Sequence, residues 1–172
     1  MNVIIEKRYK ADPDFEKIAW VLKARCKDLT RFNIQGVNVS SGVFCCTDGH
    51  RLHAAAVETY DVPDGTYTVK SINAKMVVLE MNDYQFPDYE RVFPTFKPTH
   101  RKRYNGDKST FVRDVYRKFA ADDVGFNLDY LLDLYVEDMT VEISGTGKKS
   151  KPLTIWDEGQ SRAALVMPMN DK

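Results

Sequence analysis

The chain has 172 residues, of which 43% are hydrophobic and 29% charged, and its 25 basic and 25 acidic side chains cancel to a net charge of zero. This composition, with only nine glycines and seven prolines, excludes a mainly disordered or collagen-like chain and predicts one globular domain or two small ones. No apolar run approaches the roughly 20 residues that cross a bilayer, so we expect no membrane partner.

The N-terminal residues and the cysteines bear on the cellular compartment. Residues 1–8 lack the basic-then-apolar order of a secretory signal. Cys26, Cys45 and Cys46 are odd in number and two of them are adjacent, which argues against a disulfide framework and for small core residues in a reducing environment. We therefore expect a cytoplasmic protein.

The first half of the chain begins with a predicted strand over residues 2–9 and a helix over residues 13–29. Asp12 is suited to cap this helix and Pro13 to occupy its first position. Trp20 lies away from the helix's apolar stripe, and we favour packing under the following loop over contact with a partner, contact with a ligand or a second packing layer. The stripe itself recurs at steps of three and four residues and must pack on another element: Phe15, Ile18, Ala19, Leu22, Cys26 and Leu29.

Short segments rich in apolar and β-branched residues follow, and they predict a run of strands. The expected strands cover residues 32–39, 43–47, 51–57 and 65–72, and residues 73–81 are expected to form a short helix. Asp48-Gly49 separates two of these strands and is a strong signal for a two-residue hairpin, because a type I′ turn needs positive φ at both central residues.

The second half is predicted to contain helices over residues 110–120 and 127–136 and strands over residues 140–144, 153–156 and 162–167. Asn127 is a plausible cap for the later helix, whose apolar residues share one face: Leu128, Leu131, Leu132 and Tyr135. A helix followed by three strands thus occurs near both ends of the chain. This pattern predicts an α+β fold with antiparallel sheets, in which a helix-plus-three-strand unit is repeated twice.

Charge is unevenly distributed along the chain. Residues 1–96 hold 12 basic and 13 acidic side chains, residues 97–118 hold eight and two, and residues 119–172 hold five and ten. A basic segment between neutral and acidic parts could contact phosphates. Because Pro94, Pro98 and Asn105-Gly106 break regular structure, we favour a surface loop over residues 97–110 to a dedicated nucleic-acid arm.

Motifs for catalysis are absent from the sequence, which contains no GxxxxGK[ST], GxGxxG, HExxH or GxSxG pattern. We therefore expect no enzyme activity and no cofactor. A metal-dependent nucleic-acid enzyme remains an alternative because one short stretch mixes suitable ligand types, although adjacent residues of a strand face opposite sides and a hairpin with polar ends fits better: Cys45, Cys46, Asp48, His50 and His53.

Three short segments, in order along the chain, and a helical segment between the second and the third resemble the bacterial sliding clamp, the beta subunit of DNA polymerase III. Residues 47–52 (TDGHRL) resemble a hairpin of the clamp's middle domain, and residues 86–94 (FPDYERVFP) resemble the FPDYxRV linker into its last domain. Residues 166–169 (VMPM) resemble the clamp's C-terminal MPM, and residues 125–133 (GFNLDYLLD) are similar to the FNxxYLLD helix of the last domain. The resemblance implies a DNA-clamp (processivity) fold.

The resemblance also implies a binding pocket for short peptides of polymerases and other replication proteins. Apolar side chains and thioethers would form an adaptable floor, while His50, Arg51 and Arg91 would hold peptide carbonyls or an acidic residue at the rim. Carried over position by position, the implied peptide-binding residues are Thr47, Gly49, His50, Arg51, Leu52, Pro87, Arg91, Val92, Leu165, Met167, Pro168 and Met169.

Clamps line their ring with basic helices, so the resemblance implies contacts with duplex DNA as well. One compact domain of this size cannot encircle a duplex of about 20 Å width, so a ring would require a homo-oligomer. The implied DNA-binding residues lie on the first helix and in the basic segment: Lys17, Lys23, Lys27, Arg101, Lys102 and Arg103.

The chain departs from the family in length, because a bacterial clamp chain carries three domains. We interpret residues 1–172 as a single clamp-like domain in which 1–96 resemble the clamp's middle domain and linker, 97–120 form a basic insertion, and 121–172 resemble the end of the last domain. Residues 170–172 replace the family's arginine after MPM. The expected function is a clamp-like replication accessory protein, with a non-ring clamp mimic or competitor as the alternative.

Overall fold

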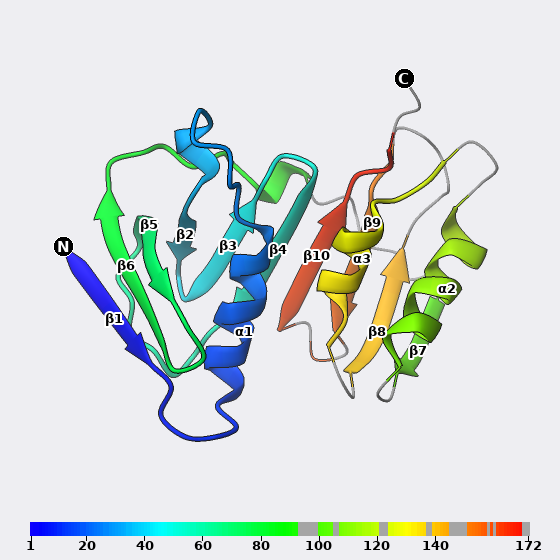
Figure 1. Cartoon of the computed structure of the whole chain (residues 1–172), viewed down its shortest axis with the longest axis horizontal. Coiled ribbons are helices and arrows are strands. Elements are labelled where there is room, and N and C mark those ends of the chain that lie inside the picture. Colours follow the sequence, from blue (N-terminus) through cyan, green and yellow to red (C-terminus); the bar gives the residue numbers. More distant parts are fainter. Residues whose placement is uncertain are drawn as a thin grey trace. The chain divides into compact units, whose positions relative to one another are not determined.

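The computed structural model describes residues 1–92, 100–104, 107–120, 124–136, 139–144, 151–157, 159 and 161–169. The chain divides into two compact units, Met1–Asp88 and Tyr89–Lys172, each with an antiparallel sheet and its own helices (Figure 1). The interpretation of residues 1–172 as one domain with a basic insertion stays a prediction. None of the helices in the described ranges is long and apolar enough to cross a membrane.

The first unit is a six-stranded antiparallel sheet with strand order β1-β6-β5-β2-β3-β4. The apolar side chains that face the helix make its core, in which Tyr67, Phe44 and Leu79 are fully buried. The elements in chain order are β1 (Asn2–Glu6), α1 (Pro13–Val21), η1 (Leu22–Ala24), η2 (Phe32–Ile34), β2 (Val37–Ser40), β3 (Val43–Thr47), β4 (Arg51–Ala56), β5 (Gly65–Ile72) and β6 (Met76–Asn82).

Helix α1 begins as the sequence predicts but ends earlier. Asp12 caps it by accepting a hydrogen bond from the backbone N–H of Phe15 at 3.2 Å, and Pro13 is its first residue. It stops at Val21 and continues only as the short η1, because the backbone turns extended at Arg25. Leu29, expected in the packed stripe, is therefore exposed.

Trp20 packs on the sheet and not under the loop that follows the helix. Its ring is buried and stacks on the imidazole of His53 on β4, with ring centroids 4.3 Å apart. The His53 Nδ1 lies 3.0 Å from the backbone carbonyl oxygen of Trp20, which joins helix and sheet a second time. The expectation for Trp20 was wrong because α1 buries a wider arc of its surface than the stripe alone.

The strand expected over residues 32–39 was wrong for Phe32–Ile34, which form the short helix η2, and β2 covers only Val37–Ser40. The turn type was also assigned to the wrong loop. Ser41 and Gly42 both have positive φ, 49° and 76°, and form the two-residue connection between β2 and β3. In the next hairpin only Gly49 has positive φ. There the Asp48 carboxylate accepts hydrogen bonds from the backbone N–H groups of His50 and Arg51, so the loop is longer than a type I′ turn.

Residues 73–81 form a turn and a strand, and the predicted short helix was wrong. β6 pairs with β5 on one side and β1 on the other. Val77 and Leu79 are fully buried, while the alternate residues are partly exposed, a two-residue period that favours a strand. The Asn73 side-chain oxygen accepts from the N–H groups of Lys75 and Met76 and thereby closes the turn before β6.

The second unit is a four-stranded antiparallel sheet with strand order β10-β9-β8-β7 and two helices. Its core includes Phe111 and Val115 of α2, Leu131 and Leu134 of α3, and Ile143 of β8. Beyond η3 (Glu90–Val92), its elements are β7 (His100–Tyr104), α2 (Lys108–Phe119), α3 (Leu128–Leu134), β8 (Met139–Ser144), β9 (Leu153–Asp157) and β10 (Arg162–Val166).

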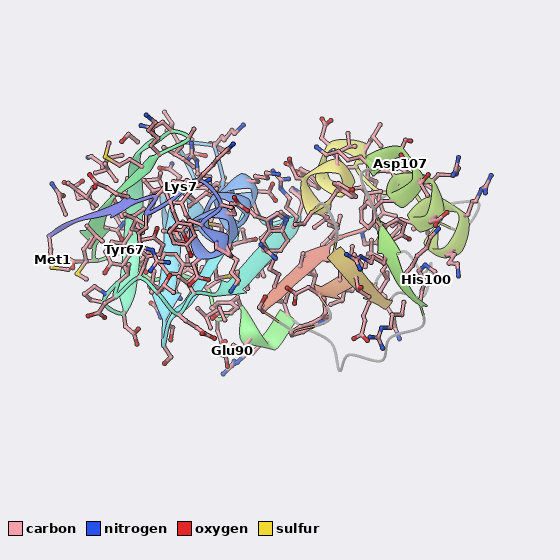
Figure 2. The ribbon with its side chains drawn as sticks, turned by 90° about the horizontal axis from the view of Figure 1, so that it is seen from below. Met1, Lys7, Tyr67, Glu90, His100 and Asp107 are labelled. Carbon is pink, nitrogen blue, oxygen red and sulfur yellow. The ribbon has the colours of Figure 1, made fainter. Side chains whose placement is uncertain are left out.

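The helices and strands of the second half of the chain agree with the sequence-based expectation except at residues 100–104. The helices and the last three strands are confirmed, including Asn127 as the cap of α3. The surface loop expected over residues 97–110 was wrong for His100–Tyr104, which form strand β7 beside β8 (Figure 2 labels His100 and, at the start of α2, Asp107). Helix-plus-three-strand runs occur as α1 with β2–β4 and as α3 with β8–β10, which confirms the predicted α+β organisation.

Candidate functional site

The hairpin of β3 and β4 holds five of the residues implied by the resemblance, at its loop and at the adjoining strand ends. The Thr47 hydroxyl donates to the carbonyl oxygen of Arg51 at 2.7 Å and accepts from the N–H of Gly49 at 3.0 Å. His50 is exposed at the tip, while Leu52 returns into the core. The loop is therefore held in one shape by its own side chains.

Arg51 is a component of the fold more than a free rim residue. Only 8% of its surface is exposed. Its Nε donates to the Asp48 carboxylate at 3.1 Å, and its Nη2 donates to the backbone carbonyl oxygen of Lys23 at 2.6 Å. The guanidinium thus ties the loop to the η1 turn that follows α1.

Arg31 also covers this loop, and the sequence analysis did not select it. Its Nη1 donates to the carbonyl oxygen of Asp48 at 2.7 Å. A Cβ on Gly49 would lie 2.5 Å from the Arg31 Nη2, and the positive φ of Gly49, 89°, adds backbone strain to any substitution. No spacing in the sequence indicates this contact, because it joins residues that are 17 positions apart.

The remaining implied residues lie in and before the second unit. Pro87 is exposed in the first unit, close to its end, and Arg91 and Val92 are exposed in η3. Met167 and Met169 are 38% and 50% exposed. Leu165, which precedes them, and Pro168, which lies between them, are buried. Residues 170–172, which differ from the family's pattern, lie outside the described residues.

The segment after β10 is fixed by its backbone. The N–H of Met169 donates to the carbonyl oxygen of Gly125 at 2.8 Å, and these two residues form an isolated antiparallel bridge. The two methionine side chains are thus presented from a backbone that is anchored at Val166 and again at Met169. Half of the implied peptide-binding residues belong to each unit, and within the first unit the structure brings Thr47, Gly49 and Arg51 together.

The stretch considered as a metal site is mostly core. Burial raises the pKa of the Cys45 and Cys46 thiols well above the ordinary range, so both are neutral. The Cys46 thiol lies 3.4 Å from the carbonyl oxygen of Gly36, and His53 is used against Trp20. Within the ranges that the structure describes, no three His, Cys, Asp or Glu side chains are grouped as metal ligands would be.

Comparison with known proteins adds the fold to these observations. No protein-family model and no curated protein sequence matches the chain. Solved structures do match: the DNA polymerase III beta subunits of Borrelia burgdorferi (TM-score 0.63, 12% identity), Pseudomonas aeruginosa (0.60, 17%) and Streptococcus pneumoniae (0.64, 14%). The matches cover 99–100% of this chain. The chain has the sliding-clamp fold.

The clamp fold is present over a shorter span than in these structures. The chain covers 65% of the Borrelia and Streptococcus clamp chains and 66% of the Pseudomonas one. At identities of 12–17% the likeness establishes the fold, and what the chain binds is a matter for proposal.

In this clamp fold, Lys17 is the one of the three lysines expected on the first helix that lies on α1. The Lys17 ammonium group bonds the Asp14 carboxylate at 2.9 Å and the backbone carbonyl oxygen of Ala56 at 3.0 Å, so it is used within the first unit. Lys23 and Lys27 are exposed, but they follow α1 and do not lie on it.

The basic strand β7 divides its side chains between two faces of the sheet. Lys102 faces α2, where its ammonium group contacts the Asp114 carboxylate at 2.6 Å. Since neighbouring residues of a strand point to opposite sides, Arg101 and Arg103 lie on the face away from α2, and Arg101 is 3.8 Å from Glu142.

Helix α2 carries the basic surface that the sequence analysis counted but did not select. Arg113 and Arg117 are exposed and four residues apart, so they share one side of the helix, with Lys118 beside them. The Lys118 Nζ lies 2.8 Å from Nδ1 of His100, and burial together with this cation lowers the pKa of His100. The helical period of residues 108–119 is the signal that could have found this face.

Proposed function

We propose that this chain is a sliding-clamp-like replication accessory protein that binds clamp-interacting peptides of DNA polymerase or related proteins. The clamp fold over the whole chain supports this proposal. The role is recruitment without bond-making chemistry, as the absence of catalytic motifs from the sequence suggests.

The observation that carries the proposal is the exposed methionine pair at the end of the second unit. Met167 and Met169 keep large apolar side chains in water on either side of buried Pro168, and the Met169 N–H bond to Gly125 prevents the segment from folding away. Thioether side chains are flexible and polarizable, so they suit a surface that accepts varied apolar peptide side chains.

The test is the double substitution Met167→Ala and Met169→Ala. We expect the affinity for a fluorescein-labelled clamp-interacting peptide of a bacterial replicative polymerase, measured by anisotropy, to fall at least about thirtyfold, because apolar anchors dominate peptide interfaces. The fold should persist, since neither side chain belongs to the buried core.

Leu128→Ala is the matched control, because Leu128 is an apolar residue of the same unit with a similar exposure, 52%, and lies outside the implied set. Its affinity should stay within about twofold of that of the unsubstituted protein. Equal losses in the control and the double variant, or none in the double variant, would overturn the pocket assignment. Arg51 is left unchanged because its substitution would disturb the fold.

Whether several copies also encircle duplex DNA is tested by light scattering with and without a closed DNA circle. The basic side of α2, with Arg113 and Arg117, supports a DNA-facing surface. For the ring version we expect a discrete multimer that stays on closed circles and leaves linear DNA. A small species that ignores DNA yet binds the peptide favours the alternative, a clamp mimic or competitor.

A further inference from the structure

Strand β1 leaves one row of backbone groups without a strand partner. The N–H of Lys7 donates to the Lys75 carbonyl oxygen and the N–H of Met81 donates to the Met1 carbonyl oxygen. In an antiparallel pair the residues that bond the neighbour alternate, so Val3 and Ile5 also direct their backbone groups toward β6. Asn2, Ile4 and Glu6 direct theirs to the other side, where the described residues supply no strand (Figure 1).

This edge has few of the features by which sheet edges avoid pairing. It carries no proline, no lysine and no bulge between Asn2 and Glu6. By contrast, β7, which ends the strand order of the second unit, carries the three successive cations Arg101, Lys102 and Arg103. Like charges set opposite one another would oppose the pairing of two such strands, but nothing comparable protects β1.

The outward side chains of β1 are apolar at the middle of the strand. Ile4 is 60% exposed, and its neighbour across the β1–β6 pair is Val78, which is partly exposed. At the ends of the same row stand Asn2 and Glu6, one neutral and one acidic. The row thus has an exposed isoleucine flanked by polar residues, on an edge without a strand partner among the described residues.

We propose that two copies of this chain form a two-fold symmetric dimer by antiparallel pairing of their β1 strands. The register that places Ile4 opposite Ile4 of the second copy uses all three outward residues, because Asn2 then faces Glu6 of that copy. Any other register of these outward residues leaves at least one of them without a partner. The two-fold register also keeps the two Glu6 carboxylates apart, so no like charges oppose each other.

The fold prepares this edge for pairing. The Tyr60 hydroxyl donates to the Glu6 carbonyl oxygen at 2.8 Å and to the Asp12 carboxylate at 2.6 Å, so the end of β1 is tied to the start of α1. A carbonyl oxygen has two lone pairs and can still accept from the N–H of Asn2 of the second copy. The dimer would gain strand hydrogen bonds and cover the Ile4 side chains.

The first test is Ile4→Lys, followed by sedimentation velocity over a wide range of protein concentration. Two lysines opposite each other at the two-fold should weaken the dimer roughly tenfold or more. The substitution keeps the β1–β6 hydrogen bonds, because the Ile4 side chain is exposed and its backbone groups face away from β6. Ile72→Lys, at an exposed isoleucine of β5 in the same unit, is the matched control and should leave the dimer unchanged.

A second pair of variants tests the register. With Asn2→Glu, a new carboxylate of one copy faces the Glu6 carboxylate of the other copy at each end of the strand pair, which should weaken the dimer several-fold. Adding Glu6→Lys places opposite charges at both ends and should restore the dimer. If β1 instead paired with the basic β7 of another copy, Asn2→Glu would strengthen association, which would overturn the proposal. A chain that stays monomeric, or an oligomer that survives Ile4→Lys, would overturn it as well.

The dimer does not depend on the proposed peptide binding. Ile4→Lys should leave the anisotropy of the labelled peptide unchanged, because Ile4 belongs to the first unit and the methionine pair to the second. Loss of the dimer with intact peptide binding, and loss of peptide binding with an intact dimer, are therefore separate results.

Discussion

Gly36→Ala is expected to destabilise the first unit by about 3 kcal/mol, the upper end of the cost of overpacking a core. A Cβ at this position would lie 1.9 Å from the carbonyl oxygen of Tyr67 and 2.9 Å from its carbonyl carbon. Both are backbone atoms of β5, directly beside the start of β2, where Val37 pairs with Tyr67. Tyr67 is fully buried and its hydroxyl donates to the Pro63 carbonyl oxygen, so β5 has little freedom to move away.

The measurement is urea unfolding followed by tryptophan fluorescence. The chain has one tryptophan in each unit, Trp20 and Trp156, so a Trp156→Phe background makes Trp20 a reporter for the first unit. Gly159→Ala is the control, because a Cβ there meets no atom within 4 Å. An unfolding free energy for Gly36→Ala equal to that of the control would mean that β2 and β5 can separate at no cost.

Much of the strand content was predictable because these segments are short, rich in apolar and β-branched residues, and separated by turn residues. β5 has the predicted bounds, and β8, β9 and β10 agree to within one residue. β6 was missed because a run such as Met76–Asn82, with few polar residues, has no clear period, and its two neighbouring strands decide its state. The same holds for β7, which is basic along its length and is a strand because it pairs with β8.

The candidate site was predictable in its residues but not in their roles. Spacing and resemblance select Arg51 and Lys17 as cations for ligands, yet the structure uses both inside the first unit. A sequence does not indicate which guanidinium will find a backbone carbonyl oxygen 28 residues away. For exposed apolar residues such as Met167, the role that the resemblance implied stays a proposal, because these side chains keep part of their apolar surface in water.

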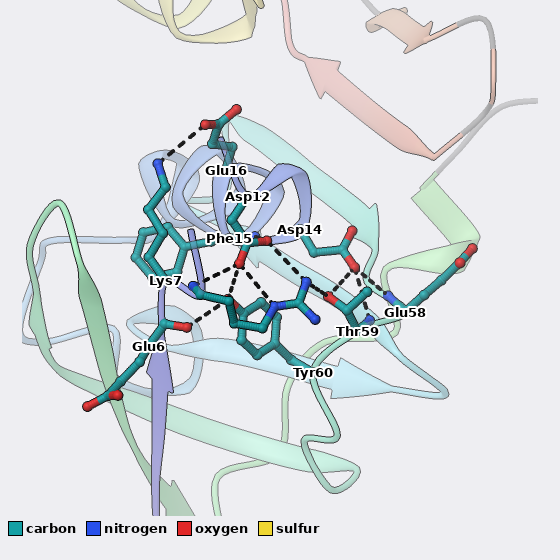
Figure 3. A network of polar contacts seen from close by, with 10 residues as sticks. Glu6, Lys7, Asp12, Asp14, Phe15, Glu16, Glu58, Thr59 and Tyr60 are labelled. Atoms are coloured by element: carbon teal, nitrogen blue, oxygen red, sulfur yellow. Dashed lines mark hydrogen bonds and ion pairs between the residues drawn. The ribbon is translucent and has the colours of Figure 1, made fainter. Parts of the chain in front are cut away.

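The second large effect concerns Asp12, whose replacement by alanine is expected to cost the first unit about 3 kcal/mol. Its side chain is fully buried at the start of α1 and is shared among several donors (Figure 3). It accepts from the N–H of Phe15 at 3.2 Å, from the backbone N–H and Nε of Arg8 at 3.1 Å, and from the Tyr60 hydroxyl at 2.6 Å. Its loss removes the helix cap and also the charged acceptor that Arg8 and Tyr60 share, and each of these two losses is worth about 1–2 kcal/mol.

Asp107→Ala is the matched control, because Asp107 caps α2 by the same hydrogen bond, to the N–H of Thr110 at 3.0 Å, but is exposed. Its loss should be clearly smaller, as water replaces what the side chain supplied. Trp20 fluorescence again reports the first unit, and Trp156, in a Trp20→Phe background, reports the second. An Asp12→Ala variant no less stable than Asp107→Ala would show that the buried cluster adds nothing to the cap.

The same cluster predicts how stability depends on pH. Burial alone would raise the pKa values of Asp12 and Asp14, but hydrogen bonds from Arg8 and Tyr60 hold that of Asp12 far below its usual range, and those from Thr59 and Lys17 lower that of Asp14 to about 2. Because these carboxyls have a pKa of about 4 when unfolded, the unfolded chain binds more protons in acid.

Their contribution is therefore complete above about pH 5 and is lost as the pH falls through about 4 toward 2. We expect the urea midpoint of the Trp20 transition to fall across this window, and to fall less steeply in Asp12→Ala, which keeps Asp14 but lacks the contribution of Asp12. Equal slopes in the two proteins would mean that Asp12 has the same proton affinity folded and unfolded. The Tyr60 hydroxyl bonds both Asp12 and the Glu6 carbonyl oxygen, so the same protonation should also loosen the end of β1.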